Sequence, residues 1–118
     1  MKLGKEDIQS IILYDWIIFN KLDDICFHVG NERSVSPQAG SIFKRKGIKP
    51  GVSDYFIMRP MTPYHGLIIE LKIKPNKPTD LQLKFLETMN KEGYLAVVRW
   101  SAKECIETIQ DYLMISST

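Results

Sequence analysis

A strand–helix–strand pattern in the second half of the chain most strongly constrains its fold. Residues 66–74 alternate in polarity as a strand does, and residues 94–100 form the nearly continuous apolar run of a buried central strand. Between them, the spacing of Thr79 and Gln82 predicts a capping box at the start of a helix over 79–92. A crossover helix between two strands predicts that the strands are parallel and that the connection is right-handed.

The remaining elements fit around this unit. Residues 5–20 predict a helix that is apolar almost all round, so we expect it to be buried in the core or against a partner chain. Further predicted elements are strands at 24–30 and 54–59, a short helix near 37–46 and a last helix after Ser101. A length of 118 residues suits one domain, residues 1–118. We therefore predict an α/β fold with a mixed central sheet flanked by helices.

The formal net charge of +2 hides an uneven distribution of charged side chains. Residues 31–78 contain nine basic and three acidic side chains, whereas the rest of the chain has more acids than bases. A basic stretch within an otherwise acidic chain is typical of a protein that contacts a polyanion such as a nucleic acid.

The two cysteines, Cys26 and Cys105, lie far apart and have no metal-binding spacing. We expect buried free thiols in a reducing cytoplasm, with a disulfide between them as the alternative. The longest apolar run, residues 11–19, is short and interrupted by Asp15. We therefore expect neither a secretory signal nor a membrane span.

We predict that the strands at 54–59 and 66–74 pair as an antiparallel hairpin, and three of their side chains indicate metal-dependent chemistry. Asp54 opens one strand after a Pro-Gly turn, and Glu70 and Lys72 point the same way on the neighbouring strand. Two carboxylates on adjacent strands suit a hard cation such as Mg²⁺, whose other ligands are waters and a substrate phosphate. The nearby ammonium suits a group that holds or helps to deprotonate a water and screens developing charge.

Each of these residues also has a structural explanation. A Glu-x-Lys pair on a strand is most often a cross-strand salt bridge, and an Asp after Pro-Gly is most often a turn residue. Gln82 either caps its helix or leads the apolar face of that helix toward the sheet and a cleft. The conjunction of all these features in one segment favours chemistry over structure.

The combined motif resembles a known family. The stretches HVGNERS, KRKGIKPGVSD and GLIIELKIKPNKPTDLQLKFLETMNKEGYLAVVRWSAKE look like the VRR-NUC domain of the PD-(D/E)xK nuclease superfamily, and the likeness runs from Glu6 to about Tyr112. This resemblance implies a restriction-endonuclease-like αβββαβ core, in agreement with the predicted order of elements. The sequence departs from the family at Ser53, where a Pro commonly precedes the Asp.

The resemblance also implies roles for individual residues. The family's catalytic positions correspond to Asp54, Glu70, Lys72 and Gln82. The backbone carbonyl of Leu71 would join Asp54 and Glu70 as a metal ligand. An acidic residue on the first helix matches Glu6, with Asp7 adjacent to it as the alternative. The implied cofactor is Mg²⁺ or Mn²⁺.

Basic side chains supply the predicted contacts with DNA. Those expected to bind the phosphate backbone are Arg33, Lys44, Arg45, Lys46, Lys49 and Lys74. Glu32 is the alternative structural partner of Arg33. Phosphate contacts position a substrate without reading its bases, so we expect recognition of DNA shape. We expect His28 and His65 to be ordinary strand and loop residues.

The predicted function is a metal-dependent, structure-selective DNA endonuclease. The family resemblance extends to small junction-resolving enzymes, and a two-fold homodimer would present two sites to a four-way (Holliday) junction. The first helix and the aromatic residues of 55–64 are the candidate interface. The alternatives are a nickase or flap nuclease acting with a replication or repair partner, and a non-catalytic nucleic-acid-binding module. A small single nuclease domain also fits a cytoplasmic protein of a bacterium or a phage-infected cell.

Overall fold

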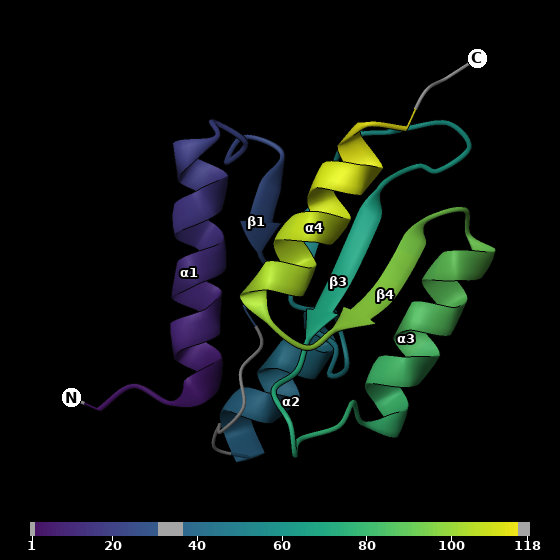
Figure 1. The fold of residues 1–118 in the computed structure, drawn as a ribbon. Coiled ribbons are helices and arrows are strands. Elements are labelled where there is room, and N and C mark those ends of the chain that lie inside the picture. The colour runs from purple at the N-terminus through teal and green to yellow at the C-terminus, as the bar shows by residue number, and fades with distance from the viewer. Residues whose placement is uncertain (1, 31–36, 116–118) are drawn as a thin grey trace.

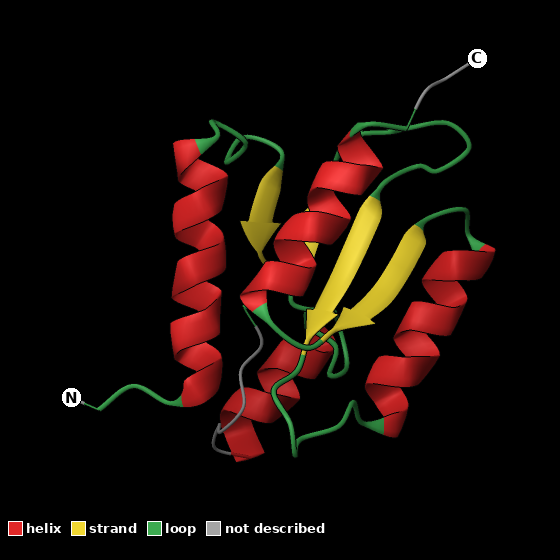
Figure 2. Cartoon of the chain, in the orientation of Figure 1, coloured by secondary structure: helices red, strands yellow, loops and turns green. Residues whose placement is uncertain are grey.

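The computed structural model describes residues 2–30 and 37–115 (Figure 1). Within these residues the elements are α1 (Lys5–Phe19), β1 (Cys26–His28), α2 (Pro37–Arg45), β2 (Tyr55–Ile57), β3 (Leu67–Leu71), α3 (Asp80–Lys91), β4 (Leu95–Arg99) and α4 (Ala102–Leu113). The predicted α/β class is confirmed, and the short helix expected near 37–46 is α2 (Figure 2).

The four strands form one mixed sheet in the order β1-β2-β3-β4. The pairs β1–β2 and β2–β3 are antiparallel, and β3–β4 is parallel as predicted. The expectation that residues 94–100 form a central strand is wrong, because β4 lies at the edge and β3 is the fully buried strand. The apolar run of β4 has another cause, since both α3 and α4 pack against it.

The helices cover the two faces of the sheet unequally (Figure 1). On one face, α1 and α4 enclose the larger core, to which the strands contribute Cys26, Tyr55, Ile57, Leu67, Ile69 and Leu71. On the other face, α3 covers a smaller core around Ile68, Leu86 and Ala96. Fully burying one large aliphatic side chain contributes roughly 1.5–3 kcal/mol, so β3 is the main anchor of both layers.

The first helix is only partly buried in its own chain, so the first of the two expectations, burial in the core, holds for one side of the helix alone. Only Leu13 and Ile17 are buried, and these side chains face the core shared with α4. Five large apolar residues of α1 are between 44% and 84% exposed, namely Ile8, Ile11, Ile12, Ile18 and Phe19. A helix in the outer layer presents only one side to the core, so the remaining apolar side chains face outward.

Both cysteines are free and buried, as expected. Burial raises the pKa of Cys26 to about 11 and that of Cys105 to about 12, which keeps both thiols protonated. Among the described residues, no helix combines the length and the apolar character that crossing a lipid bilayer requires.

Two local features fix where α3 begins and ends. The predicted capping box is present, since the Thr79 hydroxyl accepts a hydrogen bond from the Gln82 N–H and the Gln82 side chain accepts one from the Thr79 N–H. Gly93 follows the helix with a φ of 95°, a conformation that favours glycine. The capping box thereby holds Gln82 at the end of the helix nearest the carboxylates described below.

Candidate active site

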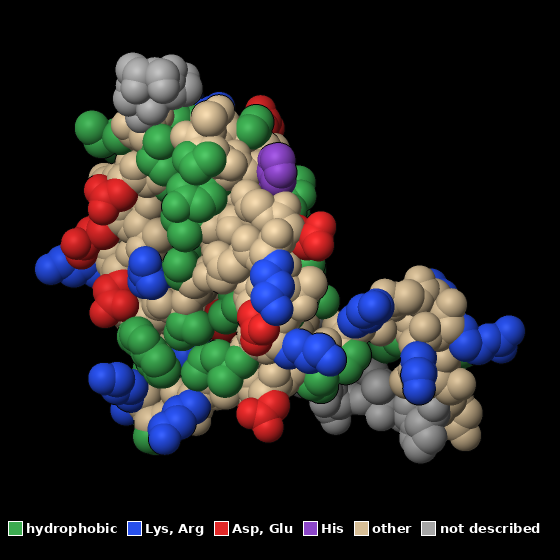
Figure 3. All heavy atoms as spheres, turned by 90° about the vertical axis from the view of Figure 1, so that its right-hand side faces the viewer, with side chains coloured by type: hydrophobic (Ala, Val, Ile, Leu, Met, Phe, Trp, Pro, Cys, Tyr) green, Lys and Arg blue, Asp and Glu red, His purple; other side chains and the backbone are tan. Residues whose placement is uncertain are grey.

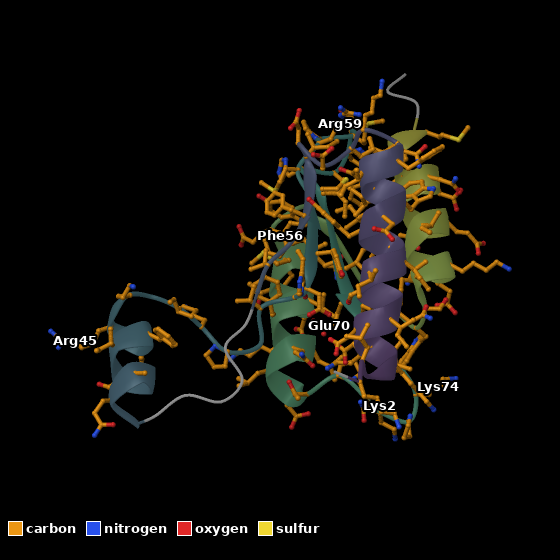
Figure 4. All side chains as sticks on the ribbon, turned by 90° about the vertical axis from the view of Figure 1, so that its left-hand side faces the viewer. Lys2, Arg45, Phe56, Arg59, Glu70 and Lys74 are labelled. Atoms are coloured by element: carbon orange, nitrogen blue, oxygen red, sulfur yellow. The ribbon has the colours of Figure 1, made fainter. Side chains whose placement is uncertain are left out.

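The candidate site lies where β2 begins and β3 ends, at the end of the sheet between α1 and α3 (Figure 4, Glu70 labelled). Tyr55 pairs with Ile69 in the antiparallel register, and one step further along the register Asp54 lies opposite Glu70. Directly opposed residues on antiparallel strands place their side chains on the same face. The pairing register therefore brings together two carboxylates that are 16 positions apart in the sequence.

Asp54 is held by its surroundings. Its exposed fraction is 7%. Its Oδ2 accepts a hydrogen bond from the Leu71 N–H at 2.9 Å, and its backbone carbonyl accepts one from the Val29 N–H at 2.6 Å. Its Oδ1 lies 3.9 Å from Nε2 of His28, whose ring stacks on Tyr55. The side chain thus has a fixed position, although nothing in the local sequence beyond the Pro-Gly turn specifies it.

Glu70 is more deeply buried, with an exposed fraction of 1%. Its Oε2 lies 3.7 Å from the Lys72 Nζ and accepts a hydrogen bond from the Gln82 Nε2 at 3.2 Å. Its Oε1 is buried and has no hydrogen-bond partner. A buried carboxylate oxygen without a partner is costly in a folded protein unless another group, such as a cation, completes the site.

The two explanations that the sequence leaves open for Gln82 are both realised. The carbonyl of its side chain caps α3, while the amide of the same side chain donates to Glu70. The predicted face of α3 also packs toward the sheet, because Phe85, Leu86 and Met89 lie in the smaller core. The capping box therefore determines the orientation of the group that contacts the buried carboxylate.

The two carboxylates have opposite pKa shifts. Burial, reinforced by the neighbouring Asp54, raises the pKa of Glu70 to about 8, and Lys72 only partly offsets this. Burial by itself would also raise the pKa of Asp54, but His28, Glu70 and the Leu71 N–H together hold that pKa below its ordinary value. Without a cation, burial and the mutual repulsion of the two carboxylates therefore favour retention of a proton by the pair.

The residues present fit a divalent cation with oxygen ligands. They offer two carboxylates, one of them with the unpartnered Oε1, and a backbone carbonyl. In an extended strand the N–H and C=O of one residue face the same neighbour, so the Leu71 carbonyl is on the side where its N–H meets Asp54. Mg²⁺ commonly uses one or two carboxylates and completes its shell with waters. Within the described residues no group of three or more His, Cys, Asp or Glu side chains forms a metal cluster.

Asp54 opens onto a cleft of about 490 Å³, whereas Glu70 does not line it but contacts the lining residues Lys72 and Gln82. Asp54, Lys72 and Gln82 line it, together with Glu6 from the first turn of α1, so the first helix does supply an acidic residue here. Asp7, the alternative, lines a neighbouring hollow instead. The cleft also contains Asn76 and Lys77, which the sequence did not single out, and the turn residues Pro50 and Gly51.

The predicted DNA-binding residues are not gathered around the carboxylates. Lys44 and Arg45 end α2, and Lys46 and Lys49 follow in the turns after it. Figure 4 shows Arg45 on α2, which projects from the body and lies apart from Glu70. We call α2 and the residues 46–51 that follow it the arm. Figure 3 shows Lys and Arg side chains on the arm. The Lys74 ammonium lies 5.7 Å from the centre of the Trp100 ring, as in a cation–π contact. Arg33 and Glu32 lie outside the described residues.

His28 is the residue near the site that sequence reasoning missed. It was expected to be an ordinary strand residue, yet it contacts Asp54 from β1. Its proximity depends on the pairing of His28 with Tyr55 across the β1–β2 ladder. A single sequence contains no direct signal for such a pairing, because the register depends on contacts between distant segments.

The fold and the cluster of Asp54, Glu70, Lys72 and Gln82 together define an α/β domain of the nuclease type. A solved structure described as a VRR_NUC domain protein is 32% identical in sequence to this chain and superposes on it with a TM-score of 0.82. The match covers 99% of this chain and 94% of that structure's chain. The chain belongs to the VRR_NUC family. Neither the models of protein families nor the curated proteins contain a match to this sequence.

Proposed function

We propose that this domain is a Mg²⁺- or Mn²⁺-dependent endodeoxyribonuclease that hydrolyses phosphodiester bonds in branched DNA. The observation that carries the proposal is that Asp54, Lys72 and Gln82 line one cleft, and that the buried Glu70 contacts Lys72 and Gln82, in a member of the VRR_NUC family. The rival reading as a non-catalytic DNA-binding module is weaker, since two carboxylates in the cleft would repel phosphate if no cation lay between them.

Each residue has a distinct task in this proposal. Asp54 and Glu70 would hold the cation with the Leu71 carbonyl, and Glu6, which lines the same cleft, would contact a ligated water. When bound, the cation would lower the pKa of the attacking water and offset the charge of the scissile phosphate. Gln82 keeps the Glu70 carboxylate oriented through its amide.

Lys72 is placed to act on the water and on the developing charge. Its ammonium lies 3.7 Å from Glu70, and its side chain is only 13% exposed. A largely desolvated ammonium at this position would orient the nucleophile and stabilise negative charge on the phosphate in the transition state. By family resemblance, the products would carry 5′-phosphate and 3′-hydroxyl ends.

A four-way junction cut by a homodimer is the substrate that we favour. Each chain supplies a single cluster of this kind among its described residues, so paired cuts need two copies. The exposed apolar side of α1 supports association with another chain, because a patch of this kind is unusual on a monomer. The alternative is a nickase or flap nuclease that acts with a replication or repair partner.

The test compares labelled four-way junctions, flaps, nicked duplexes and linear duplexes, each with Mg²⁺, with Mn²⁺ and with EDTA. We expect metal-dependent, paired cuts in the junction and no cleavage by the Asp54→Ala protein, whose binding to the junction should stay within a few fold. Cleavage of linear duplex with an intact junction would contradict the junction assignment. Unchanged cleavage by Asp54→Ala would contradict the site.

A further inference from the structure

A second hollow, separate from the catalytic cleft, lies between α1 and β1. Its volume is about 400 Å³, and its walls are mainly apolar and aromatic, with Ile11 and Tyr14 from α1 and Phe27 and Tyr55 from the strands. Ser10 and His28 complete the walls. Asp15, which is exposed, is the acidic residue in this lining. We call this hollow the α1–β1 groove. It suits an apolar side chain that is accompanied by a positive charge.

The outer face of α1 extends the apolar surface beyond the groove. The exposed residues Ile8, Ile11, Ile12, Ile18 and Phe19 follow one another at spacings of three, one, six and one, which places them along one side of a helix. Asp15 occupies the middle of this side. The groove is thus one part of a larger apolar face that has no partner among the other described elements.

Helix α2 has the complementary character. Ile42 and Phe43 are adjacent apolar residues near its end, and Ile42 is 53% exposed. Lys44 and Arg45 follow them directly, and α2 contains no acidic residue. Figure 4 shows the helix projecting from the body on the side away from α1, and α2 packs extensively on no other described element. Ile42 is therefore largely uncovered within its own chain, whereas Phe43 is half-buried.

We infer that α2 of one copy docks in the α1–β1 groove of a second copy. Ile42 and Phe43 would enter the apolar part of the groove, and Lys44 or Arg45 would approach Asp15 at its rim. One chain carries both the projecting helix and the groove, so a two-fold axis satisfies both at once and closes the assembly at two chains. This inference deepens the proposed function, because it rests on the homodimer and names the surfaces that form it.

The arm is also connected to the catalytic cleft. Pro50 and Gly51, which end the segment after α2, line the cleft beside Asp54. The exchange of arms would therefore tie each cleft to the partner copy and set the separation of the two active sites. For a junction-cutting enzyme this separation determines whether two cuts fall symmetrically about the branch point.

The first experiment measures the oligomeric state without DNA or metal, by sedimentation over a range of protein concentrations. We expect a dimer for the natural protein. Ile42→Asp on the arm and Ile11→Asp in the groove should each weaken dimerisation by roughly tenfold or more, as the loss of a buried interface anchor does. The matched control is Ile18→Asp, because Ile18 is on the same helix with the same residue type and similar exposure but does not line the groove.

A second experiment traps the contact directly. Protein with Ile42→Cys is mixed with protein carrying Ile11→Cys, and oxidation should link one chain of each kind, since both natural cysteines are buried. Reversing both charges, with Asp15→Lys and Lys44→Glu in one chain, should restore the dimer that either reversal weakens. Circular dichroism of every variant verifies that it is folded.

The outcomes separate this inference from the proposed function. Three results overturn the arm exchange, even if Asp54-dependent cleavage is observed. The protein is monomeric at all concentrations, or it forms open-ended assemblies, or the Ile11→Asp and Ile42→Asp variants dimerise as well as the natural protein. A dimer that crosslinks as described but does not cut DNA keeps the interface and overturns the nuclease assignment. If Ile18→Asp weakens the dimer as strongly as Ile11→Asp does, the α1–β1 groove is not the site where α2 of the partner copy docks.

Discussion

The carboxylate cluster and the α2 arm are both charged, yet they are built in opposite ways. Asp54 and Glu70 are buried, lie in paired strands, and contact Leu71, Lys72 and Gln82 within 3.7 Å. The basic residues of the arm are exposed and lie on a helix that projects from the body. The fold of one chain therefore fixes the groups proposed for chemistry, whereas it leaves the basic residues of the arm available to a second copy and to DNA.

The largest expected effect contrasts two lysines in the segment that follows β3. Lys72→Met should lower kcat on a junction substrate by at least about 100-fold, because its largely buried ammonium contacts Glu70. Lys74→Met is the matched control, since Lys74 contacts the Trp100 ring instead, and kcat should change less than about threefold. Single-turnover cleavage at saturating enzyme measures both. Equal losses for the two variants would contradict a special role for Lys72.

The next effect concerns the link between the arm and the body. Gly51 has a φ of 86°, and a Cβ there would lie 2.8 Å from the Leu81 Cβ. Gly51→Ala should therefore reduce the free energy of unfolding by roughly 2–4 kcal/mol, through both backbone strain and overpacking. Gly47 has a φ of 89° but open space around it, so Gly47→Ala should cost only about 1–2 kcal/mol. Urea denaturation measures both, and a larger loss at Gly47 would refute the close packing.

A smaller effect tests the arm as a phosphate clamp. Replacing Lys46 and Lys49, which the proposed dimer contact does not use, with Ala should weaken binding to a junction by roughly fivefold and reduce the dependence of binding on salt, because fewer counterions are released. At saturating DNA, kcat should be nearly unchanged. Fluorescence anisotropy over a range of KCl concentrations measures the affinity. The control, Lys84→Ala with Lys103→Ala, removes exposed charges from α3 and α4; the same loss there would show that charge alone matters.

The smallest effect concerns the proton shared by the carboxylates. The pKa of Glu70 is raised in the folded protein to about 8, so its contribution to stability is fully present below its unfolded pKa and is lost as the pH rises through about 8. In EDTA, the free energy of unfolding should therefore decline between about pH 5 and pH 8, and Glu70→Gln should flatten this decline. Chemical denaturation at several pH values measures it. A parallel decline in the variant would assign the effect to other groups.

The sequence was informative about local structure at the site. The capping box of Thr79 and Gln82, the turn before Asp54 and the shared face of Glu70 and Lys72 depend on neighbours within a few positions, and the structure has each of them. The strand 94–100 was misplaced because an apolar run reports burial by helices on both faces, and this does not reveal whether a strand is central. The contact between His28 and Asp54 could not be predicted, because it depends on the register between β1 and β2.

The α/β class, the βαβ unit, the family resemblance and the residue types of the site follow from periodicity, caps and motif spacing, so they can be predicted from the sequence alone. Which of these groups meet depends on the tertiary structure. It opposed Asp54 to Glu70, left Glu70 Oε1 buried without a partner, and exposed the apolar side of α1 and the arm of α2. The physical reason is that burial and pairing are properties of the whole packed chain. A local pattern states what a residue prefers, whereas the competition among distant segments determines what it contacts.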